Sequence, residues 1–159
     1  MTELTSPKRG KRPEFRNINI FKDLPSYSLP AAGFVSILHR ISGFLMFLLL
    51  PFIIWMFDTS VSSEISFAKF TGVFNRGLLC GATSCLVAGW FMKAIAVSLI
   101  WAYLHHFIAG LRHLWMDISH AAVTKEFGKS SALVTLALSV GLTAILAAKL
   151  FGAFDNLVK

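Results

Sequence analysis

The chain has 159 residues, of which 55% are hydrophobic and 14% are charged, and its formal net charge is +7. Its mean hydropathy of +0.67 excludes an ordinary soluble globular domain. The positive charge could indicate nucleic-acid binding, but the basic residues flank long apolar runs, and no separate domain is available to present them to a duplex. Composition therefore favours a small membrane protein that crosses the bilayer several times.

The first 29 residues are polar, basic and interrupted by prolines. Six lysines and arginines lie here, at Lys8, Arg9, Lys11, Arg12, Arg16 and Lys22. The apolar run that follows is too long for the apolar region of a secretory signal, and three acidic residues depart from the composition of a mitochondrial transit peptide. We expect 1–29 to form a basic cytoplasmic N-terminal arm and 30–159 to form a membrane-anchor domain.

Three apolar segments are long enough to cross the hydrocarbon core, which needs about 20 helical residues for about 30 Å. The first is expected at 31–57, with a kink at Pro51 because proline removes a backbone donor. The next apolar run is too long for one span and too short for two, so we predict an amphipathic or buried approach segment at about 67–84 and a span at 88–115. The third span is expected at 131–154. The predicted fold is an all-α membrane protein with three transmembrane helices.

The distribution of Lys and Arg predicts the orientation of these helices. The arm and the loop between the second and third spans lie on one side of the membrane and carry eight such residues, whereas the other side carries five. The positive-inside rule places the more basic side in the cytoplasm. We expect a multi-pass protein of the bacterial cytoplasmic (inner) membrane with a cytoplasmic N-terminus, and treat the mitochondrial inner membrane as the less favoured alternative.

The two cysteines, Cys80 and Cys85, have a C-x4-C spacing. Two cysteines are too few for a metal cluster, and the chain has no C-x-x-C-H haem-attachment motif. We expect both to serve as small apolar residues.

The first span contains the polar stretch SILHRISG. Ser36, His39, Arg40 and Gly43 follow the spacing i, i+3, i+4, i+7 and are predicted to share one helix face. An arginine at the centre of a span costs roughly 2.5–3.5 kcal/mol on insertion scales, so Arg40 is expected to face a cavity, a ligand or a partner. The alternative is that Arg40, about 14 Å of helix from the start of its span, extends to the cytoplasmic interface.

The second span ends in the polar stretch YLHHFIAGLRHLWMD. At about 100° per residue, one face carries His106, Gly110, His113 and Asp117, while His105 and Arg112 point elsewhere. A lone histidine inside a membrane is often only hydrogen-bonded to a neighbouring helix, but two on one face favour a ligand site, and neutral imidazole is a ligand of haem iron. We expect Gly110 to remove bulk beside His106, so that a flat macrocycle can approach the helix.

Consecutive spans are antiparallel, so Arg40 and His106 are predicted to lie at similar depths, near the same membrane surface. The two polar stretches would then meet and form a redox cofactor site. A haem that only transfers electrons takes two axial ligands, and His113 lies about 10.5 Å along the helix from His106. We therefore expect the second ligand from another chain, which makes the three helices part of a hetero-oligomeric helical bundle.

Three motifs carry a resemblance to a known family: RP at 12–13, SILHRISG at 36–43 and HHFIAGLRHLWMD at 105–117. They resemble the cytochrome b subunit of succinate dehydrogenase, the large membrane-anchor chain of succinate:quinone oxidoreductase. The resemblance covers roughly 12–154, although the stretch 70–89 is longer and more apolar than the first loop that is usual in that family. By position, it implies that His106 is the axial ligand of haem b iron.

The resemblance also implies roles for the neighbouring residues. His39, Arg40 and His113 would lie in the haem surroundings, with the first two near a haem propionate. Ser36 and Arg40 correspond to quinone-site residues, and Asp117 to the acidic residue at the cytoplasmic end, a candidate proton relay. The residues do not distinguish ubiquinone from menaquinone, and we take ubiquinone as the expected substrate.

The function implied by the resemblance is transfer of electrons from an iron–sulfur subunit to quinone, in the respiratory chain and the tricarboxylic acid cycle. The implied partners are a flavoprotein, an iron–sulfur subunit and a second small anchor chain that donates the other haem ligand. The chain alone would not be catalytic, because nothing in it could oxidise a dicarboxylate. The alternatives are the anchor of a fumarate reductase and a haem-free structural or proton-translocating subunit.

Overall fold

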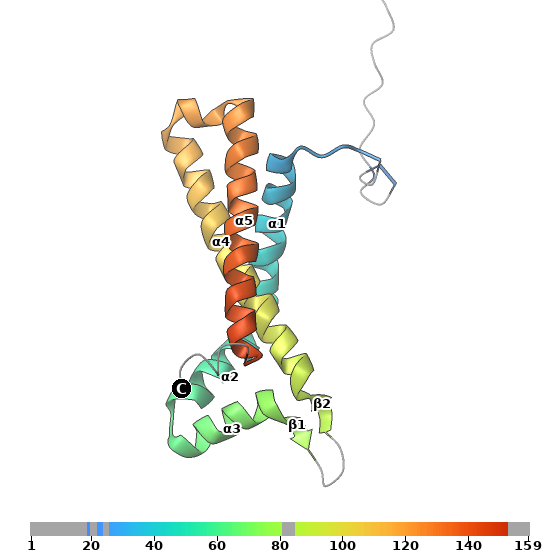
Figure 1. Ribbon diagram of the computed structural model, residues 1–159, viewed down its shortest axis with the longest axis vertical. Coiled ribbons are helices and arrows are strands. Elements are labelled where there is room, and N and C mark those ends of the chain that lie inside the picture. The colour runs from blue at the N-terminus through green and yellow to red at the C-terminus, as the bar shows by residue number, and fades with distance from the viewer. Residues whose placement is uncertain (1–18, 20–21, 24–25, 81–84, 153–159) are drawn as a thin grey trace, which may run out of the picture.

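Three long helices run side by side in the computed structural model: α1 (Ala31–Leu48), α4 (Gly89–Ile118) and α5 (Lys125–Leu150) (Figure 1). Each is long and apolar enough to cross a membrane. α4 contacts both of the others, and α1 also contacts α5. The prediction of an all-α membrane protein with three transmembrane helices is confirmed.

The structure describes residues 19, 22–23, 26–80 and 85–152. Most of the predicted arm, the RP motif and the last residues of the predicted third span lie outside this part of the chain. The arm therefore stays a prediction from the sequence.

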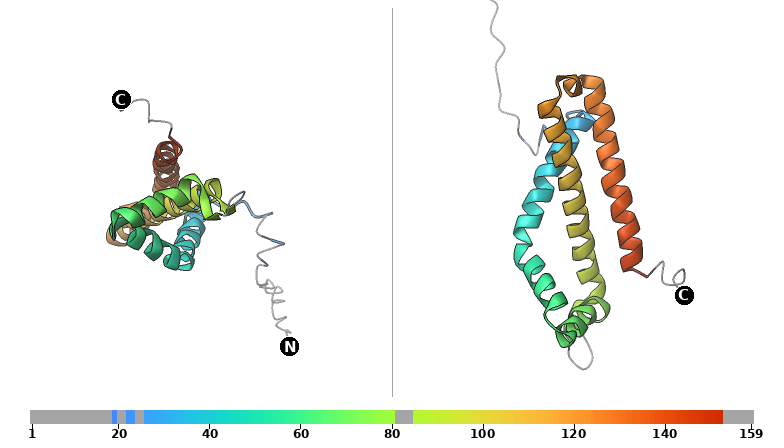
Figure 2. Two further views of the ribbon diagram at one scale, coloured as in Figure 1. Left: turned by 90° about the horizontal axis from the view of Figure 1, so that it is seen from below. Right: turned by 90° about the vertical axis from the view of Figure 1, so that its left-hand side faces the viewer.

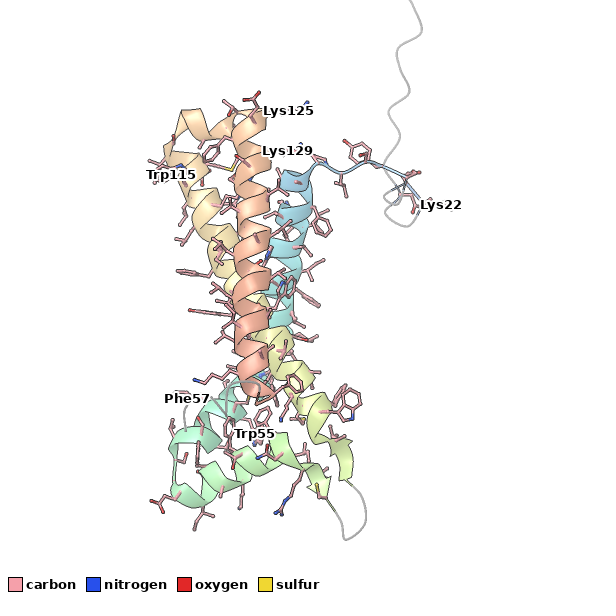
Figure 3. The ribbon with its side chains drawn as sticks, in the orientation of Figure 1. Lys22, Trp55, Phe57, Trp115, Lys125 and Lys129 are labelled. Carbon is pink, nitrogen blue, oxygen red and sulfur yellow. The ribbon has the colours of Figure 1, made fainter. Side chains whose placement is uncertain are left out.

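The bundle has two distinct ends (Figure 3). Trp115, Lys125 and Lys129 lie at the end where α1 begins and α4 passes into α5, which we call the basic end. Trp55 and Phe57 lie toward the opposite end, which we call the hairpin end because the chain forms a short β-hairpin there.

α1 ends close to a proline. Leu49 has φ −92° and ψ 9°, and α2 (Leu50–Val61) begins directly after it, with Pro51 in its first turn. Proline has no backbone N–H and so cannot continue the hydrogen-bond ladder of α1. The predicted first span, 31–57, thus consists of α1 and most of α2, which follow different directions (Figure 2).

After α2 the chain changes direction and forms α3 (Glu64–Asn75), which begins with a capping box. Ser63 Oγ accepts a hydrogen bond from the Ser66 backbone N–H at 3.1 Å, and Ser66 Oγ accepts from the Ser63 N–H at 2.9 Å. The two serines satisfy backbone donors that the first turn of a helix leaves without partners.

Two short antiparallel strands, β1 (Gly77–Cys80) and β2 (Cys85–Ala88), connect α3 to α4. The described part of the predicted approach segment at 67–84 is therefore most of α3 followed by β1, and the hairpin was not predicted. A four-residue apolar run such as GLLC fits a buried helix as well as a strand, so periodicity alone does not separate them.

The expectation that the cysteines are small apolar residues is wrong for Cys80. This residue is exposed and disulfide-bonded. In the register of the hairpin it lies opposite Cys85.

The hairpin end has a small apolar core. It consists of Val73, Phe74, Met92 and Ala96, with Leu78 and Val87 among the residues packed against it. Gly89 allows α3 and α4 to approach closely here, because a Cβ at this position would lie 2.7 Å from the carbonyl oxygen of Phe74. The start of α4 is thus positioned by direct contact with the backbone of α3.

α5 carries small and hydroxyl-bearing residues at its buried positions. These are Gly128, Ala132, Thr135, Ser139 and Thr143. Small residues let helices pack closely in hydrocarbon, where packing and hydrogen bonds drive association. α5 begins at Lys125, earlier than the predicted 131, because Thr124 caps it by accepting a hydrogen bond from the Phe127 N–H at 3.4 Å.

We expect Gly89→Ala to destabilise the protein by about 1–3 kcal/mol, because the added methyl group would overlap the backbone of α3. The matched control is Gly72→Ala in α3, where a Cβ meets nothing within 4 Å. Thermal unfolding of the detergent-purified protein measures the difference. Equal melting temperatures for the two variants would contradict the close approach at Gly89.

Candidate functional site

Two histidines from distant parts of the sequence stack on each other. The ring centroids of His39 in α1 and His106 in α4 are 4.1 Å apart, with 15° between the ring planes. The ring of His113 lies 5.3 Å from that of His39, tilted by 50°. The prediction that the polar stretches of the first two spans meet is confirmed by these contacts. We call His39, His106 and His113 the histidine cluster.

The backbone of α1 orients the His106 ring. Its Nδ1 lies 3.1 Å from the carbonyl oxygen of His39 and 3.4 Å from Oγ of Ser42. Because a carbonyl oxygen only accepts, we assign the proton to Nδ1, which leaves Nε2 of the neutral ring with a lone pair. Histidines that ligate a metal commonly use one nitrogen in this way to fix the ring and present the other.

Sequence reasoning missed Ser42, which is buried between the two helices. Its Oγ donates a hydrogen bond to the carbonyl of His39 at 2.8 Å, the same oxygen that accepts from His106. The available signal was its position three residues after His39, one helical turn along the same stretch.

Two glycines leave room for the stacked rings. A Cβ at Gly43 would lie 2.9 Å from Cε1 of His106, and a Cβ at Gly110 would lie 3.6 Å from Nε2 of His39. The expectation that Gly110 lies beside His106 is wrong, because each ring reaches across to the opposite helix. The glycine against His106 is Gly43 of α1.

The predicted common face of the SILHRISG stretch is divided in the structure. His39 and Gly43 contact α4, Ser36 is half-buried, and Arg40 is exposed. Asp117, near the end of α4, is also exposed. An exposed arginine within a span requires a partner, a ligand or access to the interface.

His105, which directly precedes His106, points away from the histidine cluster, as predicted. Its ring is fully buried, at 0% exposure, and stacks on Trp101 with centroids 5.4 Å apart. Its Nδ1 lies 3.1 Å from Oγ of Ser139 in α5, whereas Nε2 has no hydrogen-bond partner within the described part of the chain. His105 therefore joins α4 to α5 inside the bundle.

Arg112 also faces α5 and is only 8% exposed. Its Nε donates to Ser131 Oγ at 2.9 Å, and its Nη2 donates to the Gly128 carbonyl oxygen at 3.2 Å. The prediction that His105 and Arg112 lie off the His106 face is confirmed. Their serine partners on α5 were not predicted, since a sequence alone does not show which side of one helix meets which side of another.

The histidine cluster lies partly at the surface of the bundle. All three of its rings are half-buried. An apolar cavity of about 680 Å³ lies elsewhere, and its lining includes Met56, Phe74, Lys93 and Leu99 but no member of the cluster. The chain thus presents the histidines at a face that another molecule could cover.

The family model described as Succinate dehydrogenase/Fumarate reductase transmembrane subunit matches residues 9–146. The chain belongs to this family. The match includes all three members of the histidine cluster and most of α5. The resemblance noted from the sequence motifs is confirmed.

Curated members of this family are similar to the chain over most of its length. The succinate dehydrogenase cytochrome b556 subunit of Coxiella burnetii is 32% identical over 124 residues, which cover 78% of this chain and 87% of that protein. The subunit of the same name from Paracoccus denitrificans is 30% identical over 123 residues, covering 77% and 80% respectively. The one from Rickettsia typhi is 26% identical over 120 residues, covering 76% and 78%.

The side chains of the histidine cluster are chemically suited to bind a haem from one side. Within the described residues, no group of three or more His, Cys, Asp or Glu side chains is placed to hold a metal ion. Iron held in a porphyrin needs only axial ligands from the protein. The His106 ring is held in place by its Nδ1 hydrogen bond, and its Nε2 could serve as such a ligand. Gly43 and Gly110 keep side-chain bulk away from the rings. His105 lacks these features because it is enclosed between helices.

We expect Ser139→Ala to destabilise the protein by about 1–3 kcal/mol, because it would leave the buried His105 ring without its hydrogen-bond partner. Ser130→Ala is the matched control. Ser130 is exposed on the same helix, and its Oγ likewise donates to a carbonyl three residues earlier. Thermal unfolding of the purified protein compares the two, and similar losses would show that the His105 contact is unimportant.

Proposed function

We propose that the chain is the haem b-binding membrane-anchor subunit of a succinate dehydrogenase, which passes electrons from an iron–sulfur subunit to quinone. In this role it serves the respiratory chain and the tricarboxylic acid cycle, and it has no catalytic activity alone. The observation that carries the proposal is the hydrogen bond from His106 Nδ1 to the His39 carbonyl, which leaves Nε2 available as a ligand. Family membership supports it, and the three bacterial relatives described above are cytochromes by name.

In the proposed site, His106 is the axial ligand of the haem iron. His39 and His113 belong to the haem surroundings, since the His39 ring stacks on the His106 ring and the His113 ring lies 5.3 Å from the His39 ring. His39 and Arg40 provide polar and cationic groups for a haem propionate. A bound haem b supplies a one-electron carrier whose potential depends on its axial ligands and burial.

Quinone binding is assigned to Ser36 and Arg40 on α1. The two residues are four apart and so lie on neighbouring turns of one helix side. The guanidinium group of Arg40 can donate hydrogen bonds to a quinone carbonyl oxygen and stabilise the negative charge that reduction places there. Asp117, exposed near the basic end, is the candidate proton relay for the two protons that quinol formation takes up. Ubiquinone is the proposed substrate, and menaquinone has the same carbonyl chemistry.

A second anchor subunit is proposed to complete the site. The cluster rings are half-buried and Arg40 is exposed, although all of them lie within membrane-spanning helices. Ionisable side chains in spans usually face other protein or water. A second chain on this face would cover them and donate the other haem ligand, while an iron–sulfur subunit and a flavoprotein would dock at the basic end.

We place the chain in the bacterial cytoplasmic membrane with its N-terminus and basic end in the cytoplasm. The positive-inside rule supports this orientation, and the similar cytochrome b556 subunits come from bacteria. A fumarate reductase anchor is the second candidate, because the family description includes both enzymes. The two differ in the physiological direction of the same electron transfer.

We expect His106→Leu to abolish the b-type absorbance of the purified complex, because the substitution removes the proposed iron ligand. His105→Leu should lower stability through its lost contact with Ser139, yet keep the haem-to-protein ratio of the complexes that assemble. Reduced-minus-oxidised spectra, normalised to protein, measure both effects. If the His105 variant lost haem and the His106 variant kept it, the iron ligand would be His105 and not His106. A pure, active wild-type complex without b-type absorbance would refute the haem proposal.

We expect Arg40→Leu to lower quinone reduction by about tenfold or more, because a charge-assisted hydrogen bond to the substrate is lost. Reduction of an artificial acceptor by the soluble subunits should stay unchanged. Arg76→Leu is the control, since Arg76 is an exposed arginine at the hairpin end. Equal loss of both activities in the Arg40 variant would instead indicate failed assembly.

A further inference from the structure

The hairpin between α3 and α4 contains the only two cysteines of the chain. Cys80 is disulfide-bonded, and Cys85 is its direct register partner across the antiparallel pair. Directly opposite residues on antiparallel strands have Cβ atoms about 4.5–5.5 Å apart, close to the roughly 3.5–4.5 Å that a disulfide requires. Register alone therefore brings these two positions within bonding reach.

The hairpin and the basic end lie at opposite ends of the helical bundle (Figure 1). α4 joins them, beginning next to the hairpin and ending at the basic end (Figures 1 and 2). Its 30 residues span about 45 Å, which exceeds the core thickness of about 30 Å. If the basic end is cytoplasmic, the hairpin is outside the cytoplasm, where thiols are oxidised and disulfides persist.

The hairpin also has a structural need for a cross-link. Its strands have four residues each, and two-stranded hairpins of this size are marginal on their own. Leu79 has a φ of 53°, a conformation that costs a non-glycine residue about 1 kcal/mol or more. Leu78 and Val87 nevertheless pack against the core that positions the start of α4. A cross-link beyond them restricts the unfolded hairpin and favours this docking.

We propose that Cys80 and Cys85 form a structural disulfide in the periplasm and that it fixes the hairpin against the start of α4. The two thiols lose two protons and two electrons as the S–S bond forms. The electrons reduce the disulfide of a periplasmic thiol oxidase to its dithiol, by thiol–disulfide exchange. The proposal shares only the chain orientation with the proposed function, and it depends on neither haem nor quinone.

The first test measures the redox state of the cysteines in the complete complex. Cells that express it are quenched with acid, and the denatured chain is treated with a polyethylene-glycol maleimide before or after reduction. We expect no gel shift without reduction and addition of two maleimides after it, whereas Cys85→Ser should add one without reduction. Addition of two maleimides to the unreduced wild-type chain would overturn the proposal.

The second test locates the hairpin by labelling intact cells with a membrane-impermeant maleimide. In the Cys85→Ser variant, the thiol left at Cys80 should react. The control combines Cys80→Ser, Cys85→Ser and Ser130→Cys, which places a single exposed thiol at the basic end, and it should react only after the membranes are opened. The reverse pattern would overturn the periplasmic location. The b-type spectrum of the same complexes reports separately on the proposed function.

The third test concerns the fixing of the hairpin. Amide hydrogen exchange of β1 and β2 in the purified Cys85→Ser complex should be faster than in the wild type, on the order of tenfold. Exchange in α5 serves as the internal reference and should not change. Unaltered exchange in the hairpin of this variant would show that the disulfide does not hold it in place.

Discussion

The hydrogen bond between the His106 ring and the His39 carbonyl joins α1 to α4 where the polar stretches of these two helices meet. Hydrocarbon offers no hydrogen-bonding partner, so a polar side chain within a span must find one on a neighbouring helix. His106 finds it on α1, and His105, one residue earlier, finds it in Ser139 of α5. These two contacts join α1 and α5 to α4 through adjacent residues that point in different directions.

The close approach that both contacts need is provided by small residues. At the α1–α4 contact these are Gly43, Ser42 and Gly110, each against or beside a histidine ring. At the α4–α5 contact, small and hydroxyl-bearing residues line the buried side of α5. The two contacts nevertheless have different consequences. The α5 side encloses His105 completely, while the α1 side leaves His106 half-buried with one ring nitrogen available.

Properties that depend on one helix could be predicted from the sequence. Helical periodicity separated His106 from His105 and Arg112, and Pro51 indicated the break after α1. Properties that depend on how two helices meet could not be predicted. Periodicity placed Gly110 on the face of His106, but in the structure Gly43 on the other helix fills that role. The hairpin was missed for a different reason, since its short apolar strands continue the apolar run that precedes α4.

The half-buried histidine cluster is the part of the chain at which the proposed function places a partner. One ring nitrogen of His106 is hydrogen-bonded to α1, so in the proposed haem site His106 would supply one of the two protein ligands of a six-coordinate iron. Arg40 adds a positive charge on the same helix as His39, exposed at membrane depth, where the cost of leaving it in contact with lipid is several kcal/mol. A haem propionate, a quinone carbonyl and a second anchor helix would each remove part of that cost. Under the proposed function, the residues that are unfavourable in lipid would favour assembly, and cofactor binding would be coupled to subunit association.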